Sequence, residues 1–130
     1  AIGNRPIDLH LKALEAIVHP AVGEERAAFL AANAEAPVVI FDVPLLFETG
    51  GQRAMDKVVV VSAAPEVQRA RTLQRPGMSE AKLDAILARQ VPDADKRAQA
   101  DFVIPTDVPI EETRSHVRRV IACLNEVEVR

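Results

Sequence analysis

Three short runs of apolar, β-branched residues stand out along the chain. They occupy residues 37–41 (PVVIF), 57–61 (KVVVV) and 101–104 (DFVI). Strands that are covered on both faces read as continuous apolar runs, because neither face meets water. The pattern therefore predicts three strands of a parallel sheet, each buried on both faces.

Helical spacing of apolar positions fills the segments between and after these runs. Pro65 favours a helix start, Pro76-Gly77 favours a helix end after Arg75, and Ser79 is a typical N-cap. The predicted helices span residues 9–17, 21–33 and 65–75, then follow Ser79 and Asp93, and the last begins near residues 107–109. Strands that alternate with helices predict an α/β fold with a three-layer parallel sheet.

The segment between the second and third predicted strands is longer than a simple crossover requires. Residues 66–99 hold two or three predicted helices, whereas one helix is enough to connect two parallel strands. The extra helices predict an insertion over the edge of the sheet, and lids of nucleotide-binding enzymes are often built in this way. The 130 residues otherwise read as one domain.

The bulk composition narrows the classes of partner and site. Hydrophobic residues make up 48% and charged residues 27%, and the net charge is −3; this is typical of a soluble globular protein and does not favour nucleic acid. No apolar stretch approaches the roughly 20 residues that span a bilayer, so no membrane partner and a cytoplasmic location are expected. Cys123 is the one cysteine; it excludes an intramolecular disulfide, and its apolar neighbours predict a buried, inert thiol.

Asp42 is the first candidate for chemistry, because it directly follows the apolar run 37–41. Ligands of parallel sheets bind beyond the carboxyl ends of the strands, where such a carboxylate can approach a metal ion or a substrate hydroxyl. A carboxylate that merely caps the next turn explains the pattern equally well. Pro44 stops regular strand structure, and the bulky residues Leu45, Leu46 and Phe47 either line a pocket for an apolar ligand or cover the end of the sheet.

Arg71 and Arg75 are the second candidates, since residues four apart share one face of a helix. Two guanidinium groups on one face suit a polyphosphate and can stabilise a phosphoryl group in transfer. Gln68 lies on roughly the same side, and Gln90 follows the next helix. A solvated helix face is the competing interpretation of the arginine pair, and a backbone contact at a helix end is the competing interpretation of His19.

Familiar catalytic motifs are absent from the 130 residues. The sequence contains no G-x-x-x-x-G-K-[ST] loop, no G-x-G-x-x-G, no nucleophile elbow and no pair of histidines at metal-binding spacing. Gly50-Gly51 is followed by Gln and Arg and not by Lys and Ser or Thr.

In order along the chain, several segments resemble the dephospho-CoA kinase family. The Asp-Val-Pro-Leu-Leu-Phe-Glu run from Asp42 to Glu48 resembles the family's most distinctive internal motif, and the ordered set is more specific than any single piece. The resemblance covers about residues 9–121. The matching segments are residues 14–20 (LEAIVHP), residues 38–48, Arg71, residues 75–79 (RPGMS), Gln90 and residues 100–104 (ADFVI).

The resemblance implies a P-loop kinase fold with a core sheet, a helical lid and a substrate-binding helical region. It implies transfer of the γ-phosphate of ATP to the ribose 3′-hydroxyl of dephospho-CoA, with Mg²⁺, in the last step of coenzyme A synthesis. By position, Arg71 and Arg75 would contact ATP phosphates and neutralise developing charge, and Gln90 would brace the lid. Asp42 would lie near the substrate ribose or the metal ion. His19 and the loop residues Leu45, Leu46, Phe47 and Glu48 would shape the dephospho-CoA side.

The sequence departs from the family pattern at two positions and in one whole segment. Thr106 replaces the usual Asn near the adenine, where it can still form hydrogen bonds, and Pro76 replaces an Asp in the lid turn. The family's first strand, its P-loop and an Asp-bearing segment belong before residue 9. Because phosphoryl transfer depends on positioning and charge stabilisation, we expect the 130 residues alone to be inactive and, with strand edges exposed, to associate with themselves.

Two alternatives remain open from the residues. One is another nucleoside or nucleotide kinase of the same fold, against which the loop from Asp42 to Glu48 argues. The other is a non-catalytic, truncated module that binds a nucleotide or a partner. No residue is named as a certain metal ligand.

Overall fold

The computed structural model describes residues 5–127 of the chain. The chain divides into two compact units, with one ending at Asp42 and the other beginning at Val43. In the described part, none of the helices combines the length and apolar character that a membrane span needs.

The first unit is built on α1 (Arg5–Ala32), a single long helix with Pro20 inside it. Two helices were predicted here, separated near Pro20, and that prediction was wrong. A proline inside a helix removes one backbone hydrogen bond and disfavours the preceding turn. The helix nevertheless continues, because long stretches of good helix formers such as alanine, leucine and glutamate flank the proline on both sides.

Residues 37–41 form no strand, in contrast to the prediction. The ring of Phe41 instead meets Phe29 of α1 edge to face at 6.1 Å between centroids, and the Arg26 guanidinium lies 4.9 Å above the same ring. A strand exists only through hydrogen bonds to a neighbouring strand. The sheet of the described residues contains two strands, and both belong to the second unit.

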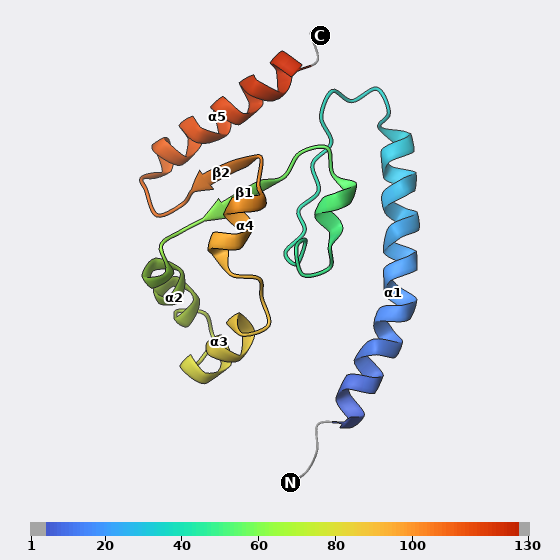
Figure 1. The fold of residues 1–130 in the computed structure, drawn as a ribbon, viewed down its shortest axis with the longest axis vertical. Coiled ribbons are helices and arrows are strands. Elements are labelled where there is room, and N and C mark those ends of the chain that lie inside the picture. Colours follow the sequence, from blue (N-terminus) through green and yellow to red (C-terminus); the bar gives the residue numbers. More distant parts are fainter. Residues whose placement is uncertain (1–4, 128–130) are drawn as a thin grey trace. The chain divides into compact units, whose positions relative to one another are not determined.

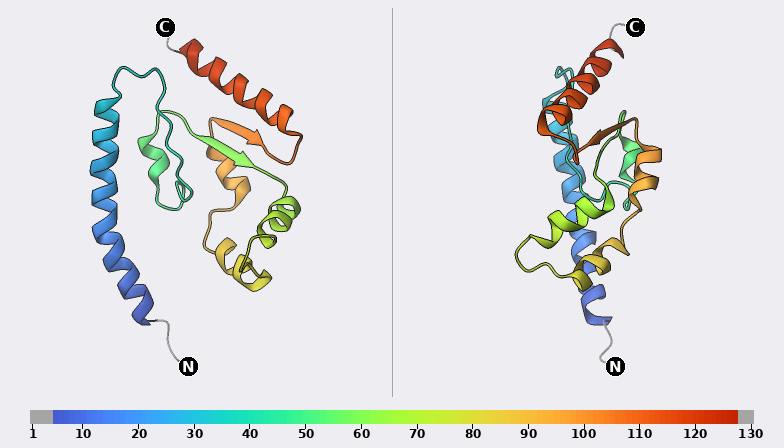
Figure 2. Two further views of the ribbon diagram at one scale, coloured as in Figure 1. Left: turned by 180° about the vertical axis from the view of Figure 1, so that it is seen from behind. Right: turned by 90° about the vertical axis from the view of Figure 1, so that its left-hand side faces the viewer.

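The second unit is organised around two parallel strands, β1 (Val59–Ser62) and β2 (Phe102–Pro105). Val59 pairs with Phe102 and Ser62 with Pro105. Figure 1 shows the strands side by side with their arrows in the same direction, and Figure 2 shows the pair from two further sides. The predictions for residues 57–61 and 101–104 thus identified both strands, with ends displaced by one or two residues.

A small apolar core supports this sheet, and its members are Val58, Val60, Leu83 and Ile104. The expectation that each strand is buried on both faces was wrong for β1. Val59 and Val61 are 42% and 66% exposed. Successive side chains of a strand point to opposite faces, so one face of β1 is covered and the other is open.

Three helices connect the strands, as the length of this segment predicted: α2 (Pro65–Leu73), α3 (Glu80–Leu87) and α4 (Asp93–Gln99). α2 begins at Pro65, and the Ser79 side chain caps α3 by accepting a hydrogen bond from Lys82 N at 3.3 Å. α2 packs on α3, and α4 packs on β1. Whether residues 66–99 move as a lid stays a prediction.

The last helix, α5 (Ile110–Val127), packs on β2. Cys123 lies on this helix and is exposed, so the prediction of a buried thiol was wrong. Ile121 and Ala122 beside it are exposed as well, and Val120 and Leu124 are only half-buried. Apolar neighbours in sequence therefore do not bury the thiol, because burial needs a neighbouring element to cover it.

Candidate functional site

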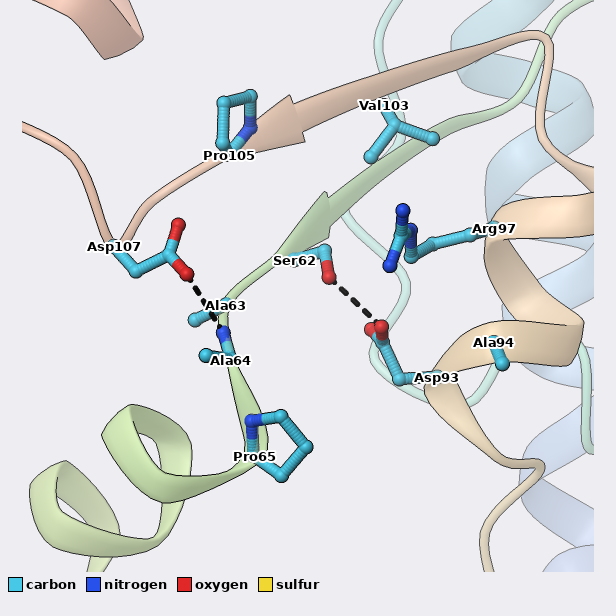
Figure 3. Close-up of a pocket in the computed structure, with 10 residues that line it drawn as sticks. All are labelled: Ser62, Ala63, Ala64, Pro65, Asp93, Ala94, Arg97, Val103, Pro105 and Asp107. Carbon is cyan, nitrogen blue, oxygen red and sulfur yellow. Dashed lines mark hydrogen bonds between the residues drawn. The ribbon is translucent and has the colours of Figure 1, made fainter.

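Hydrogen bonds join the residues at and just beyond the carboxyl ends of the two strands. Thr106 donates to the Ser62 carbonyl oxygen twice, from its backbone N–H at 2.8 Å and from its hydroxyl at 3.0 Å. One residue further on, the Asp107 carboxylate accepts a hydrogen bond from Ala64 N at 2.9 Å, as Figure 3 shows. These contacts make the carboxyl end of the sheet a fixed rim, which is where parallel sheets bind ligands.

Arg71 joins this rim from α2. Its Nη2 donates a hydrogen bond to the Thr106 carbonyl oxygen at 2.8 Å, across 35 residues of sequence. The Arg71 side chain remains exposed, and a guanidinium group carries further N–H donors in a planar fork. The structure therefore brings together two residues that the sequence analysis assigned to a nucleotide.

Arg75 lies outside α2, because that helix ends at Leu73 and Gln74 is its C-cap. Its backbone N–H donates to Thr72 O at 3.1 Å, and its own carbonyl accepts from Met78 N at 3.1 Å. The prediction that Arg71 and Arg75 share one helix face was therefore wrong. Arg75 is exposed in a turn, and the positive φ of Gly77, 75°, closes that turn.

A hollow of about 590 Å³ opens beside the rim. In Figure 3, the Ser62 hydroxyl points to Asp93 at the start of α4, and it donates to Oδ2 at 2.8 Å. The residues that line the hollow are Ser62, Ala63, Ala64, Pro65, Asp93, Ala94, Arg97, Val103, Pro105 and Asp107.

The sequence analysis did not single out Ser62 or Asp107, and it treated Asp93 only as a helix cap. A usable signal existed for Ser62, since a polar residue that directly follows a predicted parallel strand lies at the ligand-binding edge. Asp107 lies three residues beyond the predicted strand 101–104, so this signal was weaker for it. Asp93 carried no such signal, because only the packing of α4 on β1 brings it to Ser62.

A second, smaller hollow of about 290 Å³ contains two more residues from the sequence analysis, Gln68 and Gln90. The amide side chains of these residues can both donate and accept hydrogen bonds. The other residues that line it are Val60, Val61, Leu87, Val91, Pro92, Asp93 and Lys96.

The loop after Asp42 folds into tight, helix-like turns. Thr49 N donates to Leu45 O at 3.2 Å and Gly51 N to Leu46 O at 2.9 Å, and Gly50 ends the turn with a φ of 71°. Leu45 is exposed, whereas Leu46 and Phe47 are half-buried. Their proposed contact with a substrate stays a prediction.

Glu48 is the charged residue of this loop, and its side chain is half-buried. Its Oε1 accepts a hydrogen bond from Val91 N at 2.9 Å and forms an ion pair with Lys96 Nζ at 2.7 Å. Burial by itself raises the pKa of a carboxyl group. The hydrogen bonds from Lys96 and Val91 outweigh this effect, so the pKa of Glu48 lies below its ordinary value.

His19 and Asp42 belong to the first unit, and both are exposed there. Their predicted places near the substrate therefore stay predictions. Among the described residues, no group of three or more His, Cys, Asp or Glu side chains is arranged to hold a metal ion. Mg²⁺ in kinases is typically held by one or two carboxylates together with substrate phosphates. The carboxylates that line the larger hollow are those of Asp93 and Asp107.

The dephospho-CoA kinase family profile matches residues 8–112 of the chain. Proteins named dephospho-CoA kinase from Bradyrhizobium diazoefficiens, Mesorhizobium japonicum and Novosphingobium aromaticivorans are 53%, 55% and 51% identical. The matches cover 86%, 85% and 89% of this chain and 57%, 57% and 58% of the relatives.

A solved structure supports the fold. The crystal structure of TT1252 from Thermus thermophilus superimposes with a TM-score of 0.75 and is 34% identical, and the match covers 86% of this chain and 58% of TT1252. The chain thus spans somewhat more than half the length of these relatives. A family profile that accounts for most of the chain, together with relatives at half identity, settles the assignment: this chain belongs to the dephospho-CoA kinase family.

Proposed function

We propose that the protein transfers the γ-phosphate of ATP to the ribose 3′-hydroxyl of dephospho-CoA. The observation that carries the proposal is the contact between Arg71 and Thr106 at the carboxyl end of the parallel strands. It holds a guanidinium group at the edge where nucleotides bind in such sheets. Membership of the dephospho-CoA kinase family supplies the acceptor.

In the proposed reaction, Arg71 and Arg75 bind phosphate oxygens of ATP through forked, charge-assisted hydrogen bonds. Arg71 is oriented for this by Thr106, whose hydroxyl and backbone N–H are in turn fixed on Ser62. A Mg²⁺ ion bound to ATP would neutralise charge on the β- and γ-phosphates. Because phosphoryl transfer is accelerated mainly by positioning and charge stabilisation, an arginine held at the rim by Thr106 is the expected catalytic contribution of this chain.

The remaining assignments follow the family motifs. Gln90 lines the smaller hollow and would contact the nucleotide from the lid. Asp42, His19 and the loop from Leu45 to Glu48 would form the dephospho-CoA side. A reaction that consumes ATP also favours the cytoplasm as the place of action.

The test is ATP turnover by the complete open reading frame that encodes these residues. Dephospho-CoA, AMP and a set of nucleosides are offered as acceptors, and products are identified by mass spectrometry. Coenzyme A formation that depends on dephospho-CoA supports the proposal. Turnover with AMP or a nucleoside instead would identify another kinase of this fold, and nucleotide binding without turnover would identify a non-catalytic module.

The 130 residues alone are expected to give no turnover, because they contain no G-x-x-x-x-G-K-[ST] loop to hold the β- and γ-phosphates. We also expect this polypeptide to associate with itself, since Val59 and Val61 leave one face of β1 apolar and exposed. Light scattering after gel filtration and a coupled ATPase assay check both points. A monomer that phosphorylates dephospho-CoA would contradict them.

A further inference from the structure

Glu48 does not face solvent as a charged loop residue ordinarily would. Its side chain is 14% exposed and that of its partner Lys96 is 18% exposed. We infer that Glu48 is a positioning residue, whose carboxylate locks the loop of residues 45–51 onto the junction between α3 and α4 and so sets the wall of the smaller hollow. The kinetic part of this inference rests on the proposed function, whereas the structural part does not.

The backbone gives the Glu48 side chain little freedom. Hydrogen bonds within the loop fix the residues on both sides of it, from Thr49 N to Leu45 O and from Gly51 N to Leu46 O. The Thr49 hydroxyl adds two further bonds, to Leu45 O at 3.0 Å and Leu46 O at 3.2 Å. A Cβ at position 51 would lie 3.0 Å from Leu46 Cδ1, so any other residue there would have to displace the end of that side chain.

The partners of Glu48 lie more than 40 residues away and come from two places in the lid segment. Val91 follows α3, and its N–H points to Oε1 at 2.9 Å. Lys96 belongs to α4 and reaches the same oxygen at 2.7 Å. Glu48 Oε1 therefore binds both Val91, which lies in the connection between α3 and α4, and Lys96, which lies within α4.

Both partners of Glu48 line the hollow of about 290 Å³. Gln90 precedes Val91 directly, and its N–H donates to Leu87 O at 3.1 Å as the last turn of α3 unwinds. Anchoring Val91 therefore limits the directions in which the Gln90 side chain can point. Loss of the anchor would leave the loop and Gln90 each intact but free to shift relative to one another.

Energetics favour a geometric role over a purely stabilising one. The side chains of Glu48 and Lys96 are both largely enclosed, so removing either one leaves the other charge without its partner in the same place. The second oxygen, Oε2, is buried and accepts no hydrogen bond from the described residues. An unpaired buried oxygen costs free energy, which a residue kept only for stability would avoid.

A direct contact between Glu48 and dephospho-CoA is the competing explanation. A substrate ligand affects chiefly the KM of its own substrate when it is removed. A positioning residue leaves both substrates able to bind and disturbs their alignment, which lowers kcat. The two explanations therefore predict different kinetic constants for the same variant.

The experiment uses the complete open reading frame with Glu48→Gln, Glu48→Ala, Lys96→Met and the double variant Glu48→Gln/Lys96→Met. Lys57→Met is the matched control, because Lys57 forms an ion pair of similar length, 2.9 Å, with Asp101 away from the loop. Hydrogen exchange at the Val91 amide is measured first, since it needs no substrate. Steady-state kinetics follow, well below the melting temperature of each variant.

We expect the Val91 amide of Glu48→Ala to exchange at least about tenfold faster than in the unchanged protein, with no change in Lys57→Met. Glu48→Gln and Lys96→Met should each lower kcat by about tenfold or more, with either KM changed less than about threefold, and the double variant should be no worse than the single ones.

Unchanged exchange at Val91 in Glu48→Ala would overturn the lock itself. A raised KM for dephospho-CoA with an unchanged kcat would replace positioning by direct binding. Unchanged kcat and KM values in a variant with fast Val91 exchange would show that Glu48 holds the loop but does not position the substrates, which would overturn the kinetic part of the inference. If the unchanged protein shows no turnover with dephospho-CoA, the proposed function fails, and the exchange experiment still decides on the lock.

Discussion

Asp101 joins the beginnings of the two strands, and its replacement gives a quantitative test of how the sheet is held. Its Oδ2 accepts a hydrogen bond from Val58 N at 2.8 Å, and its Oδ1 pairs with Lys57 Nζ at 2.9 Å. Asp101 directly precedes β2 and Val58 directly precedes β1. Asp101→Ala removes both contacts, whereas Asp101→Asn keeps an oxygen acceptor and loses the charge.

The expected loss of stability follows from these two contacts. A hydrogen bond to a charged group contributes about 1.5–3 kcal/mol, and an exposed ion pair about 0.2–1 kcal/mol. The side chains of Lys57 and Asp101 are 45% and 34% exposed, which places both contacts in the lower half of their ranges. We expect Asp101→Ala to lower the free energy of unfolding by about 2 kcal/mol, Asp101→Asn by about 1 kcal/mol and Lys57→Met by about 0.5 kcal/mol or less.

The contribution of Asp101 should also depend on pH. The hydrogen bond from Val58 N–H, followed by the one from Lys57, lowers the pKa of Asp101 in the folded protein. A lowered pKa gives stability that is fully present above the unfolded-state pKa of about 3.9 and is lost as the pH falls through the folded-state pKa. The difference in stability between the unchanged protein and Asp101→Asn should therefore shrink as the pH falls below about 4.

Urea denaturation of the complete gene product at pH 7 and at several acidic pH values measures these differences. The variants are compared side by side with Lys57→Met, which removes the ion pair and keeps the hydrogen bond from Val58 N to Asp101. An Asp101→Ala protein as stable as the unchanged one would refute the assignment of the strand anchor. A difference for Asp101→Asn that grows as the pH falls would refute the direction of the pKa shift.

Two further predictions concern the rim and the loop. Arg71→Ala should lower kcat by about tenfold to a thousandfold in the coenzyme A assay, and Arg71→Lys should restore little of the activity because lysine lacks the planar fork. Arg69→Gln, which breaks the ion pairs to Glu80 and Asp84, is the control. Equal losses of kcat in Arg71→Ala and Arg69→Gln would contradict the assignment. Gly50→Ala should lower the free energy of unfolding in urea by about 1–2 kcal/mol, because Gly50 has a φ of 71°. Gly23→Ala inside α1 should raise it by about 0.5–1 kcal/mol. An unchanged stability of Gly50→Ala would show that the loop does not need this turn.

Local patterns predicted much of the second unit. The apolar runs at 57–61 and 101–104 correspond to β1 and β2. As expected, Pro65 begins α2 and Ser79 caps α3. These signals act within a few residues, through buried side chains and the unpaired N–H groups of a helix start. They are therefore readable without knowledge of the fold.

The same patterns failed where the deciding partner lies elsewhere. Residues 37–41 have the composition of a strand but form none, because a strand needs a neighbour and composition does not supply one. Pro20 has the signature of a helix end but lies inside α1. In both cases the surroundings override the local preference. Residues 37–41 have no neighbouring strand to pair with, and strong helix formers flank Pro20.

Several residues of the candidate site could be named from sequence, but the contacts between them could not. Arg71, Gln90 and Glu48 could be named from sequence motifs, and the family resemblance to which they contribute is confirmed. Thr106 could be named only as the residue that replaces the family's usual Asn. Neither the bond from Arg71 to Thr106 nor the lock of Glu48 on Val91 and Lys96 could be foreseen, since each joins residues more than 30 positions apart. Sequence determines which chemical groups are present and which local turns carry them. Only the packing of helices against the parallel strands decides which of these groups meet, because hydrogen bonds and ion pairs act over a few ångströms in space, whatever the separation along the chain.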